Sequence, residues 1–203
     1  MQSKSTAILD FWFGKNFQHG MPDKSYQARW FNVDTQLDEL IRTRFSSDLE
    51  AAADGHYNHW RNNPRGRLAL IILLDQFSRN IYRGTARAFA YDKQASELAL
   101  EGLEIGHDQQ LIAAYRIFFY MPLEHSESLE HQQRCLALFE DFYKTCAPQI
   151  ADTIKTNVAF AQQHLDIIER FGRFPHRNEL LGRPSTAQEL AYLEMTNNNF
   201  GQG

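Results

Sequence analysis

The segment from residue 171 to 186 combines side chains that a connecting loop does not need. Arg173, Arg177 and Arg183 stand beside His176 and Asn178, among two phenylalanines, two glycines and two prolines. Turn-forming and solvated residues suffice for a linker, and aromatic rings between planar cations do not help one. Guanidinium groups bind carboxylates and phosphates through paired hydrogen bonds. The segment therefore predicts contact with an anion, either a carboxylate of this chain or a ligand from outside.

A second polar group follows a long apolar run and spans residues 75–83. Asp75 and Arg79 are four residues apart, so their side chains can pair on a helix. Gln76 and Arg83 lie on a neighbouring stripe of the same helix. One interpretation is an ion pair that satisfies polar groups where an apolar helix leaves the core. The other is an arginine pair that faces a groove and binds a carboxylate or phosphate.

The third polar group lies between residues 122 and 131. Glu127 and His131 are four residues apart, a spacing that lets two side chains of one helix reach one metal ion, and His164 is a further candidate ligand. In the simpler interpretation, Glu124 and Glu127 are first-turn acids that favour the helix dipole, and His125 is a loop histidine. The His-Glu-x-x-His order of metalloproteases is absent, and no credible third and fourth ligand follows at fixed spacing. We therefore expect no metal and no cofactor.

Each of these groups lies where an apolar segment ends, so stacked antiparallel helices would bring them to one edge. In the structural interpretation, the arginines only hold Asp75, Glu124 or Glu127 in place. In the functional interpretation the groups form one pocket, where a histidine near neutral pH exchanges protons. The acid–base candidates are His176, His125 and Glu124. The ligand-binding candidates are Arg79, Arg83, Arg173, Arg177, Asn178, Asp75, Gln76 and Glu127.

The elements that position these groups are helices, because apolar residues recur at three- and four-residue spacing through most of the chain. Asn63 and Pro64 mark a helix start, Met121-Pro122 a stop, and Thr186 to Glu189 a capping box. No segment shows sustained strand alternation or an Asn-Gly hairpin signal. The expected helices span residues 5–13, 23–31, 35–53, 65–81, 92–106, 109–120, 126–146, 150–171 and 186–195.

These patterns predict an all-α protein of eight or nine helices with short loops, packed as successive antiparallel pairs. Residues 1–196 are expected to form a single all-helical domain, and residues 197–203 a frayed C-terminal tail. The central helix is the one over 65–81, since its run 68–74 is apolar on every side. That run is far shorter than the roughly 20 residues of a membrane span.

The composition excludes several classes of function. With 203 residues and a formal net charge of −4, the chain has no overall attraction for nucleic acid or anionic membranes. Its first residues lack the pattern of a signal peptide, so a cytoplasmic location is expected. Cys135 and Cys146 lie about three turns apart on one expected helix, too far to bond, and are expected to be small core residues. Phosphate-binding loop, nucleophile-elbow and dinucleotide motifs are absent.

The aromatic residues near the N-terminus are expected to pack in the core or at an interface rather than to stack on bases. A homodimer through this region is left open, because large aromatic patches favour association. The residues are Phe11, Trp12, Phe13, Trp30 and Phe31.

Three long blocks of the chain resemble one bacterial family. They are residues 64–89, which include Leu74-Asp-Gln-Phe-Ser-Arg-Asn-Ile-Tyr-Arg83, then Tyr120-Met-Pro-Leu-Glu-His-Ser-Glu127, then Phe171-Gly-Arg-Phe-Pro-His-Arg-Asn178 with Leu181-Gly-Arg183. The chain resembles bacterial domain-of-unknown-function family 924 from Ile8 to Glu194. The resemblance implies a fold of the tetratricopeptide-like superfamily, a right-handed array of antiparallel helix pairs. It implies no activity and no catalytic residues.

The leading functional hypothesis is a binding module whose Arg/His/Glu-lined groove holds a peptide, a protein segment or a small anionic ligand. The alternative is a hydrolase-like enzyme acting on a small anionic substrate, with His176, His125 and Glu124 as its acid–base groups. The absence of known catalytic motifs favours the binding module. A closed pocket where these residues meet would favour the enzyme.

Overall fold

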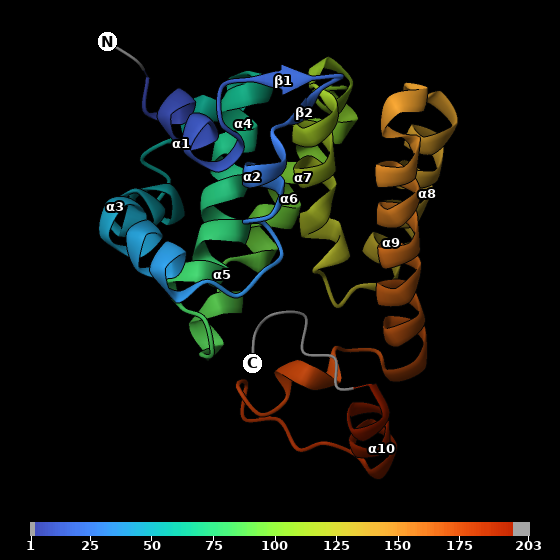
Figure 1. Cartoon of the computed structure of the whole chain (residues 1–203). Helices are drawn as coiled ribbons and strands as arrows, with labels where there is room; N and C mark the ends of the chain where they lie inside the picture. The colour runs from blue at the N-terminus through green and yellow to red at the C-terminus, as the bar shows by residue number, and fades with distance from the viewer. Residues whose placement is uncertain (1–2, 197–203) are drawn as a thin grey trace.

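The computed structural model describes residues 3–196, and helices make up nearly all of its regular structure (Figure 1). This confirms the predicted all-α class. The expected frayed tail, 197–203, lies outside the described residues. The α-helices are α1 (Lys4–Phe13), α2 (Lys24–Gln27), α3 (Thr35–Ala53), α4 (Pro64–Ile71), α5 (Ser78–Ile81), α6 (Asp92–Glu104), α7 (Ala113–Glu124), α8 (Leu129–Thr145), α9 (Ala151–Phe171) and α10 (Ala187–Thr196).

The central helix is formed by α4, the π-helical segment η2 (Ile72–Phe77) and α5 in continuous succession. It begins as predicted, with Pro64 in its first turn and the Asn63 side chain accepting a hydrogen bond from the Gly66 amide at 2.8 Å. The run 68–74 is buried throughout. The π-helical turn carries Asp75 and Gln76, and such turns occur frequently at functional sites.

The core surrounds this central helix. α1, α3, α6 and α7 all pack against it, and α1 supplies aromatic side chains to the core (Figure 1). The ring of Trp12 lies edge-on to Phe77 and Phe118, with centroids 5.6 and 5.8 Å apart. Trp12 and Phe13 are buried, as predicted for the N-terminal aromatic residues, whereas Phe31 is exposed. Homodimer formation stays a prediction.

Two long antiparallel helices, α8 and α9, form a hairpin that packs on α7 (Figure 1). Beyond α9 the chain turns at Gly172, whose φ of 67° places it in the left-handed region. The segment from 172 to α10 then lies below the other helices in Figure 1. The predicted capping box is confirmed, because the Thr186 amide donates to Glu189 Oε2 at 2.7 Å and the Glu189 amide donates to Thr186 Oγ1 at 3.2 Å.

The prediction that Pro122 ends a helix is wrong. α7 runs through Pro122 to Glu124, and the 3-10 turn η4 (Asp108–Gln110) precedes it. Proline removes one backbone donor, but Tyr120 and Leu123 on either side are fully buried, and their packing outweighs that loss. Glu124 and His125 therefore lie at the C-terminal end of α7. The interpretation of Glu124 as a first-turn acid is wrong as well.

Other helix boundaries also differ from the prediction. α8 begins at Leu129, with Ser128 as its N-cap, so Glu127 precedes the helix and does not share a helical face with His131. Among the residues that the structure describes, no group of three or more potential metal ligands is found. The expected helix over 23–31 ends at Gln27.

A short hairpin of β1 (Phe17–Gln18) and β2 (Met21–Pro22) precedes α2. His19 and Gly20 connect the strands with φ values of 50° and 79°. Two positive φ angles are typical of a type I′ turn, which the sequence makes here without the Asn-Gly signal. The Ala114 amide donates to the Gly20 carbonyl at 2.9 Å, so the turn is fixed against the start of α7.

The thiols are free, and Cys135 is buried whereas Cys146 is half-buried. The core prediction is therefore confirmed for Cys135, whereas Cys146 packs against the core from a half-buried position. Within residues 3–196, no helix is both long and apolar enough to cross a membrane. The cytoplasmic location stays a prediction.

Close packing of α6 against its neighbours depends on Gly102. A Cβ atom there would lie 2.5 Å from Phe119 Cζ and 2.6 Å from Arg67 Cδ. We expect Gly102→Ala to lower the free energy of unfolding by about 1–3 kcal/mol, because both neighbours would have to shift. Chemical denaturation measures this. Glu97→Ala, at an exposed position of the same helix, should change stability by less than about 0.5 kcal/mol, and equal stability of the two variants would contradict the close packing.

Candidate functional site

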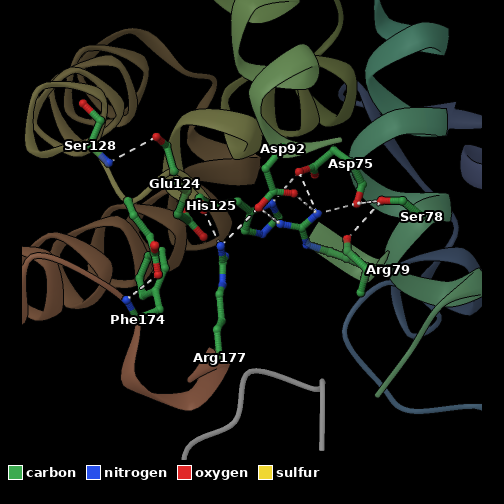
Figure 2. Close-up of polar contacts among 12 residues, drawn as sticks. Asp75, Ser78, Arg79, Asp92, Glu124, His125, Ser128, Phe174 and Arg177 are labelled. Atoms are coloured by element: carbon green, nitrogen blue, oxygen red, sulfur yellow. Dashed lines mark hydrogen bonds and ion pairs between the residues drawn. The ribbon is translucent and has the colours of Figure 1, made fainter. Parts of the chain in front are cut away.

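Three polar segments that are distant in sequence meet at the C-terminal end of α7 (Figure 2). His125 Nδ1 lies 2.7 Å from Asp75 Oδ1. Arg177, in the 3-10 turn η6 (Pro175–Arg177), donates from Nη2 to the His125 carbonyl at 2.9 Å. The Phe174 amide donates to Glu127 Oε1 at 2.8 Å. The expected meeting of the three polar groups is therefore seen in the contacts.

The polar cluster, as we call Asp75, Arg79, Asp92, Glu124, His125 and Arg177, has a carboxylate that was not predicted. Arg79 donates to both oxygens of Asp92, at 2.9 and 3.0 Å, and Arg177 donates to Asp92 Oδ2 at 3.1 Å. Figure 2 shows the two guanidinium groups converging on this carboxylate. Asp92 is the first residue of α6, where an acid is equally explained by the helix dipole. Its position alone therefore could not identify it as a site residue.

Asp75 is the fully buried anion of the cluster. It accepts a hydrogen bond from the Gln76 side chain, and its Oδ1 lies 3.3 Å from Arg79 Nη1. Burial by itself raises the pKa of the Asp75 carboxyl, but the charge of Arg79 and the hydrogen bonds from His125 and Gln76 outweigh it and hold the pKa well below its usual range. Asp75 is therefore ionised at neutral pH.

Glu124 has the opposite protonation state to Asp75. Burial, reinforced by the negative charge of Asp75, raises the pKa of the Glu124 carboxyl to about 8. Its Oε1 lies 3.7 Å from His164 Nδ1, which is 2.8 Å from the Phe160 carbonyl. At neutral pH Glu124 therefore keeps its proton, close to a carboxylate that has lost its own.

His125 lies between these groups and is oriented by Asp75. Because an ionised carboxylate only accepts hydrogen bonds, His125 Nδ1 is the donor, and Nε2 holds the lone pair of the neutral ring. Burial and the charge of Arg79 lower the pKa of His125, although Asp75 opposes them. The ring is therefore neutral at physiological pH, and 14% of the side chain stays exposed.

His164 and His176 flank Phe174 beside the cluster, with ring centroids 5.6 and 5.5 Å from it. Burial lowers the pKa of each histidine to about 3, and nearby positive charges contribute. The Arg177 guanidinium lies 4.5 Å from the Phe174 ring centroid. Burial lowers the pKa of Arg177 to about 10, so it remains charged at neutral pH.

Two predicted site residues have partners elsewhere. Arg83 donates to both oxygens of Asp38 on α3, at 2.7 and 3.0 Å. Arg173 donates to both oxygens of Glu189 on α10, at 2.6 and 2.8 Å. The prediction that both arginines converge with His125 is therefore corrected.

Glu127 and Asn178 hold the C-terminal segment rather than the polar cluster. Arg183 donates to both Glu127 oxygens, at 2.7 and 2.9 Å, and to Asn178 Oδ1 at 3.0 Å. Arg183 was not among the predicted site residues, although its place beside Arg177 in the same loop was a signal. The structural interpretation, in which an arginine of the 171–186 segment holds Glu127, is therefore seen in the contacts of Arg183.

The cluster contains acid–base groups without net charge. Two carboxylates, Asp75 and Asp92, balance two guanidinium groups, Arg79 and Arg177, and Glu124 and the histidines are neutral at physiological pH. A protonated carboxyl and an oriented imidazole with a free lone pair are the groups that proton transfer requires.

Fold and site together define an all-α protein with a buried acid–base cluster at the end of its central helices. The chain belongs to the family described as bacterial protein of unknown function (DUF924), whose model matches residues 8–197. It is similar to the solved structure of a protein of unknown function, ATU0120, from Agrobacterium tumefaciens, at 37% identity and a TM-score of 0.80, over 94% of this chain and 97% of that one. Comparison with curated proteins finds no match. The grouping with tetratricopeptide-like proteins stays a prediction.

Proposed function

We propose that the polar cluster is the catalytic centre of a hydrolase-like enzyme that acts on a small anionic substrate. The observation that carries the proposal is the 2.7 Å contact of His125 with the buried Asp75, next to a Glu124 whose pKa is raised to about 8. Paired groups whose environments push their pKa values apart are typical of acid and base partners in catalysis. Asp75 also lies in a π-helical turn, and such turns occur frequently at functional sites.

Water is the nucleophile that fits the site. The Ser78 hydroxyl donates to the Leu74 carbonyl at 2.6 Å, and burial raises the pKa of the Cys135 thiol well above its ordinary value. His125 Nε2 takes a proton from water as the water oxygen bonds to a substrate carbonyl carbon. Glu124 gives its proton to the leaving oxygen as the carbon–oxygen bond breaks. Loss of the His125 proton to solvent and protonation of Glu124 restore the starting state.

His176 is less suited to this role than His125. Because burial lowers its pKa to about 3, it is a weak base at neutral pH. A binding module would use the same two guanidinium groups, Arg79 and Arg177, but it would not require the oriented His125 or the protonated Glu124. The Asp92 side chain is 16% exposed, and an anionic substrate would approach the two arginines beside it.

The proposal predicts turnover of a small anionic ester. We expect the protein to hydrolyse mono(4-nitrophenyl) succinate faster than the neutral ester 4-nitrophenyl butyrate, because in the proposed complex the substrate carboxylate would approach Arg79 and Arg177. The rate should rise with pH as His125 loses its proton and fall through about pH 8 as Glu124 loses its own. His125→Asn should lower kcat/KM by about 100- to 10,000-fold, as for removal of a general base.

Asparagine at position 125 retains a hydrogen-bonding group near the position of Nδ1, so circular dichroism should show an unchanged fold. His131→Asn is the control, because His131 Nδ1 contacts only the Ser126 hydroxyl at 2.9 Å among the contacts described, and it should keep full activity. Turnover no faster than buffer, or full activity of His125→Asn, would refute the catalytic role.

A further inference from the structure

A cleft lies at the opposite ends of the helices that carry the polar cluster. The N-termini of α4 and α7 and the β1–β2 hairpin come together at the top of Figure 1. A half-open cleft of about 410 Å³ lies here, lined by residues of these elements and of α1. Small-molecule sites have volumes of roughly 300–1,000 Å³. The cleft is therefore large enough for a small ligand, and it is separate from the proposed catalytic centre.

One wall of the cleft is apolar and well fixed. Tyr115 is buried, and the Phe17 ring lies edge-on to it with centroids 5.5 Å apart. Leu111 and Ile112 continue this wall, and Ile112 is 39% exposed although it is apolar. The hydrogen bond from the Ala114 amide to the hairpin holds Phe17 in position. A flat apolar group would find a preformed surface here.

The rim of the cleft is positively charged. The Arg65 guanidinium lies 5.6 Å from the Tyr115 ring centroid, and both Arg65 and Lys15 are exposed. Lys15 Nζ is 3.7 Å from Asp10 Oδ2, a loose contact for an ion pair. Two cations and one carboxylate leave one net positive charge at the rim. That charge favours an anion over a neutral molecule.

We infer that this cleft binds an amphipathic monocarboxylate with a small aromatic or aliphatic group. The apolar group contacts Phe17, Leu111 and Ile112, and the carboxylate pairs with Lys15 and Arg65. Arginine suits the carboxylate because its paired donors match two oxygens. The inference is independent of the proposed hydrolysis, because the two sites have no residue in common.

Three probes separate the contributions to binding. Phenylacetate carries both a ring and a carboxylate, phenylacetamide lacks the charge, and acetate lacks the ring. In amide-detected NMR titrations of the whole chain, phenylacetate should shift the signals of Phe17, Leu111 and Ile112 and bind at least about tenfold tighter than either other probe, since one charge-assisted contact accounts for about tenfold.

Lys15→Met and Arg65→Met retain the side-chain stems without the charge. Each should weaken phenylacetate binding about tenfold, and Lys155→Met, an exposed lysine on α9, should leave it unchanged. Both positions are exposed, so the variants should keep the wild-type spectrum elsewhere. Equal binding of phenylacetate and phenylacetamide, equal loss in Lys155→Met, or shifts confined to other parts of the chain would overturn the inference.

Discussion

Replacing Arg79 with methionine is expected to lower the free energy of unfolding by about 3–5 kcal/mol. Methionine fills similar space but removes the charge that faces Asp75 and Asp92. Asp75 is fully buried, so it would be left as an anion with only His125 and Gln76 to compensate it. Denaturant unfolding at pH 7 measures the loss.

Arg134→Met is the matched control for this change. Arg134 and Glu104 pair at 2.6 Å, but both side chains are exposed, and such pairs contribute no more than about 1 kcal/mol. A loss below about 0.5 kcal/mol in Arg79→Met would show that the cluster is not a buried ion-pair network. That result would contradict the structure, in which Arg79 compensates the negative charges of Asp75 and Asp92.

Glu124→Gln is expected to make the protein more stable than the wild type at pH 8 and about equal to it near pH 5. Glutamine has the shape of the protonated side chain but never ionises. The pKa of Glu124 is raised from 4.5 to about 8, so the folded state holds this proton more tightly than the unfolded state. Its stabilising effect is complete below about pH 4.5 and is lost as the pH rises through 8.

Between pH 5 and pH 8 this loss amounts to about 3 kcal/mol in the wild type. The pKa values of His164 and His176 are lowered by burial, so their contribution to stability falls as the pH drops below 6.5. The informative quantity is therefore the difference between variant and wild type at each pH. Glu140→Gln, at an exposed position of α8, is the control for the loss of one acidic side chain. A flat difference for Glu124→Gln would contradict the raised pKa.

The parts of the fold that could be predicted are those that local sequence determines. The apolar run 68–74, the cap at Asn63 and the capping box at Thr186 act within a few residues, and each lies in the structure where it was expected. Pro122 shows the limit, because burial of Tyr120 and Leu123 outweighs a local helix-stopping signal.

The sequence could predict which segments meet at the candidate site, but not which carboxylate each arginine contacts. Helix ends at one edge indicated that Asp75, His125 and Arg177 would meet, and they do. Which carboxylate each arginine contacts depends on tertiary packing, and the chain offers 25 acidic residues. Asp92 was therefore not predicted to be a site residue. The proton on Glu124 could not be predicted either, since its raised pKa results from burial that sequence alone does not reveal.

The most direct test of the acid–base cluster is the titration of the Glu124 carboxyl by ¹³C NMR. Glutamate labelled at the carboxyl carbon gives one signal per residue, and the signal missing from Glu124→Gln identifies Glu124. We expect a midpoint near pH 8. A midpoint near 4.5, the ordinary value for glutamate, would show that Glu124 is ionised at neutral pH and cannot act as the proton donor.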